Sequence, residues 1–263
     1  MMARGVTAVL VGAILLTGCG SRSGDAKGDG VHDSTSVTGA SSTKGGDGPV
    51  LRWRMTGGIA GIGGPMAVPD FSLYPDGTAI VPTGRGKAQL RRYHLKQPAV
   101  QRLVDEARRA GLQQSRRIGT DAHIADAMVL VMQMGSAQTE IVQPESQDVP
   151  ATRLWKKLQP EQWPKSDQQS PPDAYQPERV AVNALGTGEH PAAGMPAWPL
   201  SPLGEGRKMP GGLCTVYSGK DAATVRDLAA RTPLGTRFTS GGAVYTVRVR
   251  PLLPDEKSCA ALA

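Results

Sequence analysis

A short stretch in the middle of the chain combines residues that could bind a divalent metal ion. Asp121, His123 and Asp126 lie within six residues of one another, and imidazole nitrogen with carboxylate oxygen is an ordinary ligand set for such an ion. A catalytic site also needs ligands that are held by further hydrogen bonds. The same three residues suit a polar turn before a buried strand, so we predict neither a metal site nor a cofactor.

The glycine-rich stretch from Gly57 to Gly64 has the composition of a phosphate-binding loop. Such a loop leads directly into the N-terminus of a helix, whereas Pro65 and Pro69 follow here. The spacing of a dinucleotide-binding motif and the lysine of a P-loop are both missing. We therefore predict a loop after the first strand.

Two sequence motifs of common hydrolases are absent. The chain has neither Gly-x-Ser-x-Gly nor His-Glu-x-x-His. The neighbouring carboxylates Asp255 and Glu256 could act as a general acid and base if burial raised one pKa. Because Pro254 precedes them close to the chain end, we expect both to be exposed, and we predict no catalytic centre.

The N-terminus has the pattern of an export signal. Arg4 precedes an apolar stretch, Gly5 to Leu16, which ends in the sequence Leu16-Thr-Gly-Cys19. These four residues resemble the lipobox of bacterial lipoproteins, in which the cysteine is diacylglycerated and becomes the first residue. The alternative is an ordinary signal peptide with an incidental cysteine. The resemblance implies a lipid anchor on Cys19 at the extracytoplasmic face of the cell membrane, where two acyl chains give stable attachment.

The remaining cysteines allow one disulfide bond. If Cys19 is acylated, only Cys214 and Cys259 are left, and an exported protein meets an oxidising compartment. We predict a structural Cys214–Cys259 disulfide, with redox-active or free thiols as the alternative.

Composition divides the chain into five segments. Between Gly20 and Gly48 there are eight Gly and nine Ser or Thr, too little apolar surface to offset the entropy of ordering. Five Pro and five Gln occur between Gln159 and Glu178. We predict a signal peptide (1–18), the lipidated cysteine with a flexible tether (19–48), an N-terminal subdomain (49–158), a linker or long surface loop (159–178) and a C-terminal subdomain (179–263).

Hydrophobic periodicity predicts an α+β fold of mostly antiparallel sheets with one main helix in each half. The sequence Asp76-Gly77 predicts a hairpin turn between two of the strands. Strands are predicted over 51–55, 71–74, 78–81, 89–95, 127–134, 138–142, 179–185, 213–217 and 243–250. Helices are predicted over 98–110, 152–158 and 221–231.

The segment from Arg85 to Arg117 is strongly basic, with ten Lys or Arg against Asp105 and Glu106. Pairs four residues apart, Arg102 with Glu106 and Asp105 with Arg109, would neutralise part of this charge. The segment predicts either a solvated face or a face that binds anionic lipid head groups or wall polymers. The candidate residues for such binding are Arg85, Lys87, Arg91, Arg92, Arg108, Arg109, Arg116 and Arg117. Because the protein is predicted to be exported, we do not expect it to bind nucleic acid.

The C-terminal end is similar to a known family. Val249-Arg-Pro-Leu-Leu-Pro-Asp-Glu-Lys-Ser-Cys259, together with Cys214-Thr-Val-Tyr-Ser-Gly-Lys-Asp-Ala222 and Pro196-Ala-Trp-Pro-Leu200, resembles a family of uncharacterised actinobacterial lipoproteins and secreted proteins. The segments 71–77, 110–112 and 124–127 fit the same pattern. The matching cysteines agree with a disulfide, and the resemblance implies no established activity.

These observations predict a lipid-anchored extracytoplasmic lipoprotein with a non-catalytic binding or structural role at the cell envelope. They indicate no ligand and no protein partner. The alternative is an envelope-anchored protease inhibitor that uses the Gly57 to Gly64 loop, since Gly57-Gly-Ile-Ala-Gly-Ile62 resembles the emfourin type of inhibitor.

Overall fold

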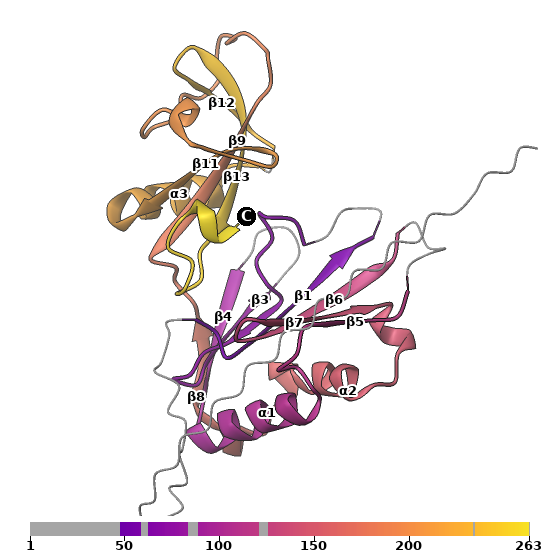
Figure 1. The fold of residues 1–263 in the computed structure, drawn as a ribbon. Coiled ribbons are helices and arrows are strands. Elements are labelled where there is room, and N and C mark those ends of the chain that lie inside the picture. The colour runs from indigo at the N-terminus through magenta and orange to yellow at the C-terminus, as the bar shows by residue number, and fades with distance from the viewer. Residues whose placement is uncertain (1–47, 59–62, 84–88, 121–125, 234, 263) are drawn as a thin grey trace, which may run out of the picture. The chain divides into compact units, whose positions relative to one another are not determined.

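The computed structural model describes residues 48–58, 63–83, 89–120, 126–233 and 235–262. Residues Ser42–Ala263 form one compact unit, which contains two β-sheets (Figure 1). The predicted signal peptide, Cys19 and nearly all of the tether lie outside the described residues. Within the described ranges, no helix has the length and apolar character needed to cross a membrane.

The first sheet contains eight strands in the order β5-β7-β6-β1-β2-β3-β4-β8. Neighbouring strands are antiparallel except for β5 and β7, which are parallel. The strands are β1 (Leu51–Gly57), β2 (Phe71–Leu73), β3 (Thr78–Thr83), β4 (Gln89–Leu95), β5 (Arg116–Ile118), β6 (Met128–Met134), β7 (Ala137–Val142) and β8 (Gln168–Ala174). The strand predicted over 127–134 is confirmed as β6, which is central in the sheet because it lies between β1 and β7.

Helices α1 (Gln97–Arg109) and α2 (Pro150–Lys157) lie side by side against one face of this sheet (Figure 1). Val100, Val104 and Ala107 of α1 recur at helical spacing and are buried in the core beneath the helices. The apolar periodicity of the sequence therefore places α1 as predicted.

The end of α1 also follows the prediction. Gly111 has a φ of 77°, and its N–H donates to the Arg108 carbonyl at 2.9 Å. The Leu112 N–H donates to the Ala107 carbonyl at 3.1 Å. These two bonds form a Schellman motif, in which glycine takes the left-handed position that other residues adopt at a cost.

The predicted Asp76-Gly77 turn connects β2 and β3. The Asp76 side chain accepts a hydrogen bond from the Thr78 N–H at 2.8 Å. Gly77 has a φ of 90°, and a Cβ at this position would lie 2.3 Å from the Leu95 carbonyl oxygen. Glycine is therefore required both by the turn and by the close approach of the next strand.

Residues around this hairpin alternate between two cores. Phe71 and Leu73 are buried beneath the helices. Tyr74 and Ile80 instead belong to a smaller cluster that also contains Leu253 from the C-terminal end. Since successive strand residues point to opposite faces, the first sheet contacts the C-terminal segment with the face that the helices do not cover.

The second sheet contains five antiparallel strands in the order β10-β11-β9-β13-β12. Helix α3 (Gly219–Arg231) packs against it through Ala222, Val225 and Leu228, which join a core around Trp198 and Phe238. The strands are β9 (Arg179–Gly186), β10 (Arg207–Met209), β11 (Gly212–Ser218), β12 (Arg237–Ser240) and β13 (Ala243–Pro251).

The structure confirms the α+β class with mostly antiparallel sheets. It also contains four short or edge strands that the sequence patterns do not predict: β5, β8, β10 and β12. Strand β8 lies in the segment predicted as a linker or surface loop and pairs with β4. Short 3-10 helices complete the described chain: η1 (Pro144–Ser146), η2 (Pro160–Gln162), η3 (Lys165–Asp167), η4 (Leu203–Glu205) and η5 (Cys259–Leu262).

The predicted disulfide is present. Cys214 on β11 and Cys259 on η5 are bonded, with their Cα atoms 6.1 Å apart. Both cysteines are buried in a cluster with Ala181, Leu252 and Leu262. Helix α3 lies between them in the sequence, so the bond closes a loop around the C-terminal half.

Replacing both Cys214 and Cys259 with Ala should lower the free energy of unfolding by about 2–4 kcal/mol, because the unfolded chain regains the entropy of a closed loop. Urea denaturation in a Cys19→Ala background measures this effect without the lipid. Two thiols that can be alkylated in the non-reduced, natively isolated protein would contradict the bond.

Candidate functional site

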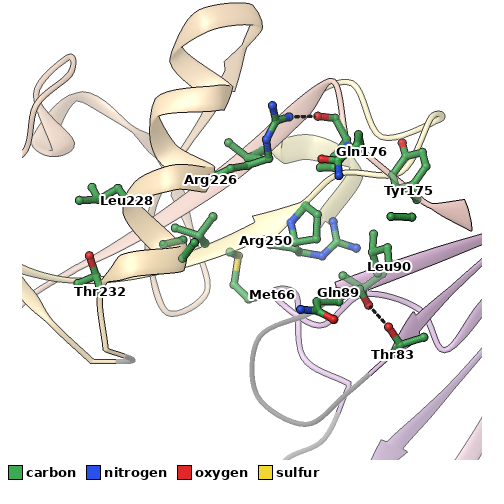
Figure 2. A pocket seen from close by; sticks show the side chains of 18 of the residues that line it. Met66, Thr83, Gln89, Leu90, Tyr175, Gln176, Arg226, Leu228, Thr232 and Arg250 are labelled. Carbon is green, nitrogen blue, oxygen red and sulfur yellow. Dashed lines mark hydrogen bonds between the residues drawn. The ribbon is translucent and has the colours of Figure 1, made fainter.

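The structure contains a cavity of about 860 Å³ (Figure 2). Helix α3 and strands β9, β12 and β13 contribute to its walls, and so do β4, the end of β8 and the segment 66–68. Small-molecule sites have volumes of about 300–1,000 Å³. The cavity is therefore large enough for a ligand.

Apolar side chains form most of the cavity wall. Leu228, Val247 and Val249 line it and remain half-buried, although they pack against the core of the second sheet. Met66 and Val68 line it from the segment after the glycine-rich stretch and are also half-buried. The cavity therefore offers an apolar surface that the protein itself leaves incompletely covered.

A buried ion pair lies beside this wall. Arg250, which lines the cavity, donates two hydrogen bonds of 2.8 Å to the carboxylate of Glu256, and both side chains are less than 5% exposed. The Nε of Arg250 donates to the Ala67 carbonyl at 3.1 Å. Glu256 Oε2 also accepts from the Leu253 N–H at 2.9 Å. Every charge of this pair is satisfied within the protein, which makes it a structural element of the wall.

The carboxylate next to it connects the C-terminal segment to the first sheet. Asp255 Oδ1 accepts hydrogen bonds from Arg52 at 2.8 Å and from the Tyr74 hydroxyl at 2.6 Å. The prediction that Asp255 and Glu256 are exposed is therefore wrong. Asp255 is held by Arg52 and Tyr74, which are distant in the sequence. Glu256 is held by Arg250, six residues before it. Both carboxylates therefore belong to a structural network, unlike a general acid–base pair.

We name residues 250–259 the C-terminal clasp, since they join several elements that are far apart in the sequence. The clasp begins at Arg250 on β13, contacts β1 through Asp255 and ends at Cys259, which is bonded to β11. Leu252 and Leu253 between these points are both buried. The clasp therefore fixes the position of Pro251 and Arg250 in the cavity wall.

Tyr175 supplies a neutral polar group to the cavity. Its hydroxyl donates to the carbonyl of Leu252 in the clasp at 3.2 Å. Burial raises the pKa of Tyr175 to about 12, and the carboxylate of Glu178 adds to this effect. The phenol therefore stays protonated near neutral pH and offers hydrogen bonding without charge.

Asp173 is the only acidic residue in the described cavity lining, and its charge is already balanced. Arg92 binds its carboxylate at 2.5 Å, and His94 lies 3.4 Å away. The hydrogen bond from Arg92 lowers the pKa of Asp173 to about 2. The carboxylate is therefore ionised but committed to a cationic neighbour.

The eight candidate residues for anionic binding are distributed over separate elements. Arg91 and Arg92 lie on β4, Arg108 and Arg109 on α1, and Arg116 and Arg117 on β5, while Arg85 and Lys87 lie outside the described residues. Among the six that are described, Arg91 alone lines the cavity.

Most of the described basic residues in this segment form ion pairs or hydrogen bonds. Arg92 pairs with Asp173, Arg108 with Asp105, and Arg117 with Glu140. Arg116 donates to the Ala110 carbonyl at 2.6 Å.

Both predicted pairs at a spacing of four residues are wrong. Arg102 contacts Asp167 at 2.6 Å, and Glu106 contacts Lys157 of α2 at 2.8 Å. Asp105 contacts Arg108 at 2.7 Å, not Arg109. For Arg102 and Glu106, charged groups from elements packed beside α1 compete successfully with the partners within the helix, whereas Asp105 pairs with the arginine three residues later.

The other stretches singled out from the sequence are only partly described. Residues 121–125 lie outside the described residues, so the structure does not place the combination of Asp121, His123 and Asp126. Residues 59–62 of the glycine-rich loop lie outside them as well. In the ranges that the structure does describe, no group of three His, Cys, Asp or Glu residues is arranged to hold a metal ion.

The sequence does not reveal the cavity, because segments spread from residue 66 to residue 251 contribute its lining. One available signal was the alternation on β13, where Val247 and Val249 share a face. Another was Arg226 among the apolar residues of α3. Neither signal shows that the apolar face meets an open space.

Comparison with known proteins yields no relative. No protein-family model, no curated protein and no solved structure matches the chain. The resemblance to actinobacterial lipoproteins stays a prediction, and the site is interpreted from its own geometry.

Replacing Glu256 with Gln should lower the free energy of unfolding by about 3–5 kcal/mol, because it leaves the buried Arg250 without a counter-ion. Asp148→Asn is the matched control. It breaks the Arg153–Asp148 pair, whose acid is 88% exposed, and should cost less than about 1 kcal/mol. Urea denaturation measures both variants, and equal losses would contradict the structural role of the buried pair.

Proposed function

We propose that this protein is a lipid-anchored lipoprotein of the extracytoplasmic face of the cell membrane, and that it binds an apolar small molecule in the cavity. Its role in this proposal is binding without catalysis. The observation that carries the proposal is the cavity with its incompletely covered apolar wall.

The free energy of packing supports binding over a purely structural role. Protein interiors are close-packed, and voids larger than a water molecule are few. Leaving an aliphatic side chain half-covered forgoes roughly 1 kcal/mol of the 1.5–3 kcal/mol available from full burial. Leu228, Val247, Val249, Met66 and Val68 all line this one space. A bound ligand would cover these side chains and recover that free energy, which favours a binding role for the cavity.

The sequence of the N-terminus supports the anchoring. The lipobox resemblance at Leu16-Thr-Gly-Cys19 predicts acylation, and the 29 residues after it are rich in Gly, Ser and Thr. A flexible coil of this length reaches about 30 Å. Such a tether would let the folded unit take a ligand from the membrane surface or the surrounding envelope.

Cys19→Ala should release the protein from the membrane fraction, because it removes the site of diacylglycerol attachment. Cell fractionation with mass spectrometry of the N-terminal peptide measures the location and the acylation together. A Cys19→Ala protein that remains acylated and sediments with membranes would contradict the anchor.

The cavity should bind the neutral dye N-phenyl-1-naphthylamine, whose fluorescence rises in apolar surroundings. Ala229 lines the cavity on α3, so Ala229→Trp should fill part of the space and lower the dye affinity about tenfold. Fluorescence titration of the Cys19→Ala chain measures this effect. Thr224→Trp is the control, since Thr224 is exposed on the same helix and is not among the lining residues.

Two results would contradict the ligand-binding proposal. One is the absence of a fluorescence increase with the unaltered cavity. The other is an equal response to the dye in the Ala229→Trp and Thr224→Trp variants.

A further inference from the structure

Positive charges outnumber negative charges in the cavity lining. Four charged residues line it: Arg91, Asp173, Arg226 and Arg250. Arg250 is paired with Glu256, and Asp173 with Arg92. Among the residues that the structure describes, no carboxylate forms an ion pair with Arg226 or Arg91. The lining therefore has an excess of positive charge beside its apolar surface.

Arg226 is the more informative of the two unpaired arginines. It is half-buried on α3, two residues before Leu228, and Nη1 donates a hydrogen bond to the Pro177 carbonyl (Figure 2). That bond orients the guanidinium across the space between α3 and the chain after β8. A guanidinium carries five N–H donors. Only one of them is used in the hydrogen bond to the Pro177 carbonyl, so the others could donate to a ligand.

Arg226 is half-buried, so its guanidinium has lost part of its contact with water without gaining a counter-ion among the described residues. The dipole of a carbonyl group orients Arg226 but does not neutralise it. Arg91 is exposed on β4 and adds positive charge to the lining without a described carboxylate partner. Charge complementarity therefore favours an occupant with a negatively charged group.

We infer that the ligand is a single-chain anionic amphiphile, with its acyl chain against the aliphatic wall and its carboxylate or phosphate head group on Arg226. This inference rests on the proposed function and narrows the class of ligand. The guanidinium plane suits both head groups, since it can donate two parallel hydrogen bonds to either. Leu228, Val247 and Val249 supply the surface for the chain.

The test is competition against N-phenyl-1-naphthylamine in the Cys19→Ala chain. Dodecanoate, dodecyl phosphate, dodecanol and dodecylamine have the same chain and differ in head group, and each is used below its micelle concentration. Dodecanoate or dodecyl phosphate should displace half of the dye at a concentration about tenfold lower than dodecanol, and dodecylamine should be the weakest competitor. The relative order of the two anions distinguishes a carboxylate ligand from a phosphate ligand.

Arg226→Gln should abolish the preference for anions while dodecanol competes as before. Glutamine removes the charge and keeps a polar, unbranched side chain at this position. Arg231→Gln is the matched control, because Arg231 is exposed on the same helix and is not a lining residue. It should retain the full preference.

The outcomes separate this inference from the proposal on which it rests. Dye uptake with equal competition by dodecanol and the anions would overturn the anionic ligand and leave an apolar binding site. Anion preference that survives Arg226→Gln would overturn the role of Arg226. A chain that takes up no dye would overturn the binding function itself. The comparison of head groups uses the unaltered cavity, so it decides the inference even if the Arg226→Gln variant folds poorly.

Discussion

The Arg250–Glu256 ion pair is the constraint on which the arrangement of the two sheets depends. Two charges that are almost completely shielded from water must satisfy each other, because either one alone would be strongly destabilising. The chain between them therefore has to turn so that Glu256 faces back toward β13. That turn buries Leu252 and Leu253 and presents Asp255 to Arg52 and Tyr74 of the first sheet. Three residues after Glu256, Cys259 is bonded to Cys214.

The cavity follows from the same arrangement. Arg250 and Pro251 stand in its wall, and the bond from Arg250 to the Ala67 carbonyl positions the segment 66–68 beside them. Helix α3 packs on the second sheet through Ala222 and Val225 nearer its beginning. Its later turns line the cavity. Packing is thus complete near the beginning of α3 and incomplete near its end, where the cavity lies.

The sequence predicts the main helices and strands of this fold far better than it predicts the short edge strands and the contacts between elements. Periodic apolar residues identify α1, α3, β1, β6 and β13, because each buries one regular face. Strands β5, β10 and β12 have only three or four residues, too few to establish a period. Strand β8 contains Pro171 and Pro172, which argue against a strand except at the edge of a sheet, and the edge is where it lies. Asp255 and Glu256 read as exposed from the local sequence because Arg52 is distant in the sequence, and because Arg250 meets Glu256 only after the chain between them turns back.

The basic residues show why charge density alone did not identify the site. The segment 85–117 is the most basic part of the chain, yet Arg92, Arg102, Arg108 and Arg117 are all paired with carboxylates. Arg226 belongs to a helix with ordinary composition and would attract no notice in a count of charges. Its significance comes from two conditions that only the structure supplies, an apolar cavity around it and a hydrogen-bond partner that carries no charge. A single cation in such surroundings constrains the chemistry of a ligand more than a cluster of cations whose charges are already balanced.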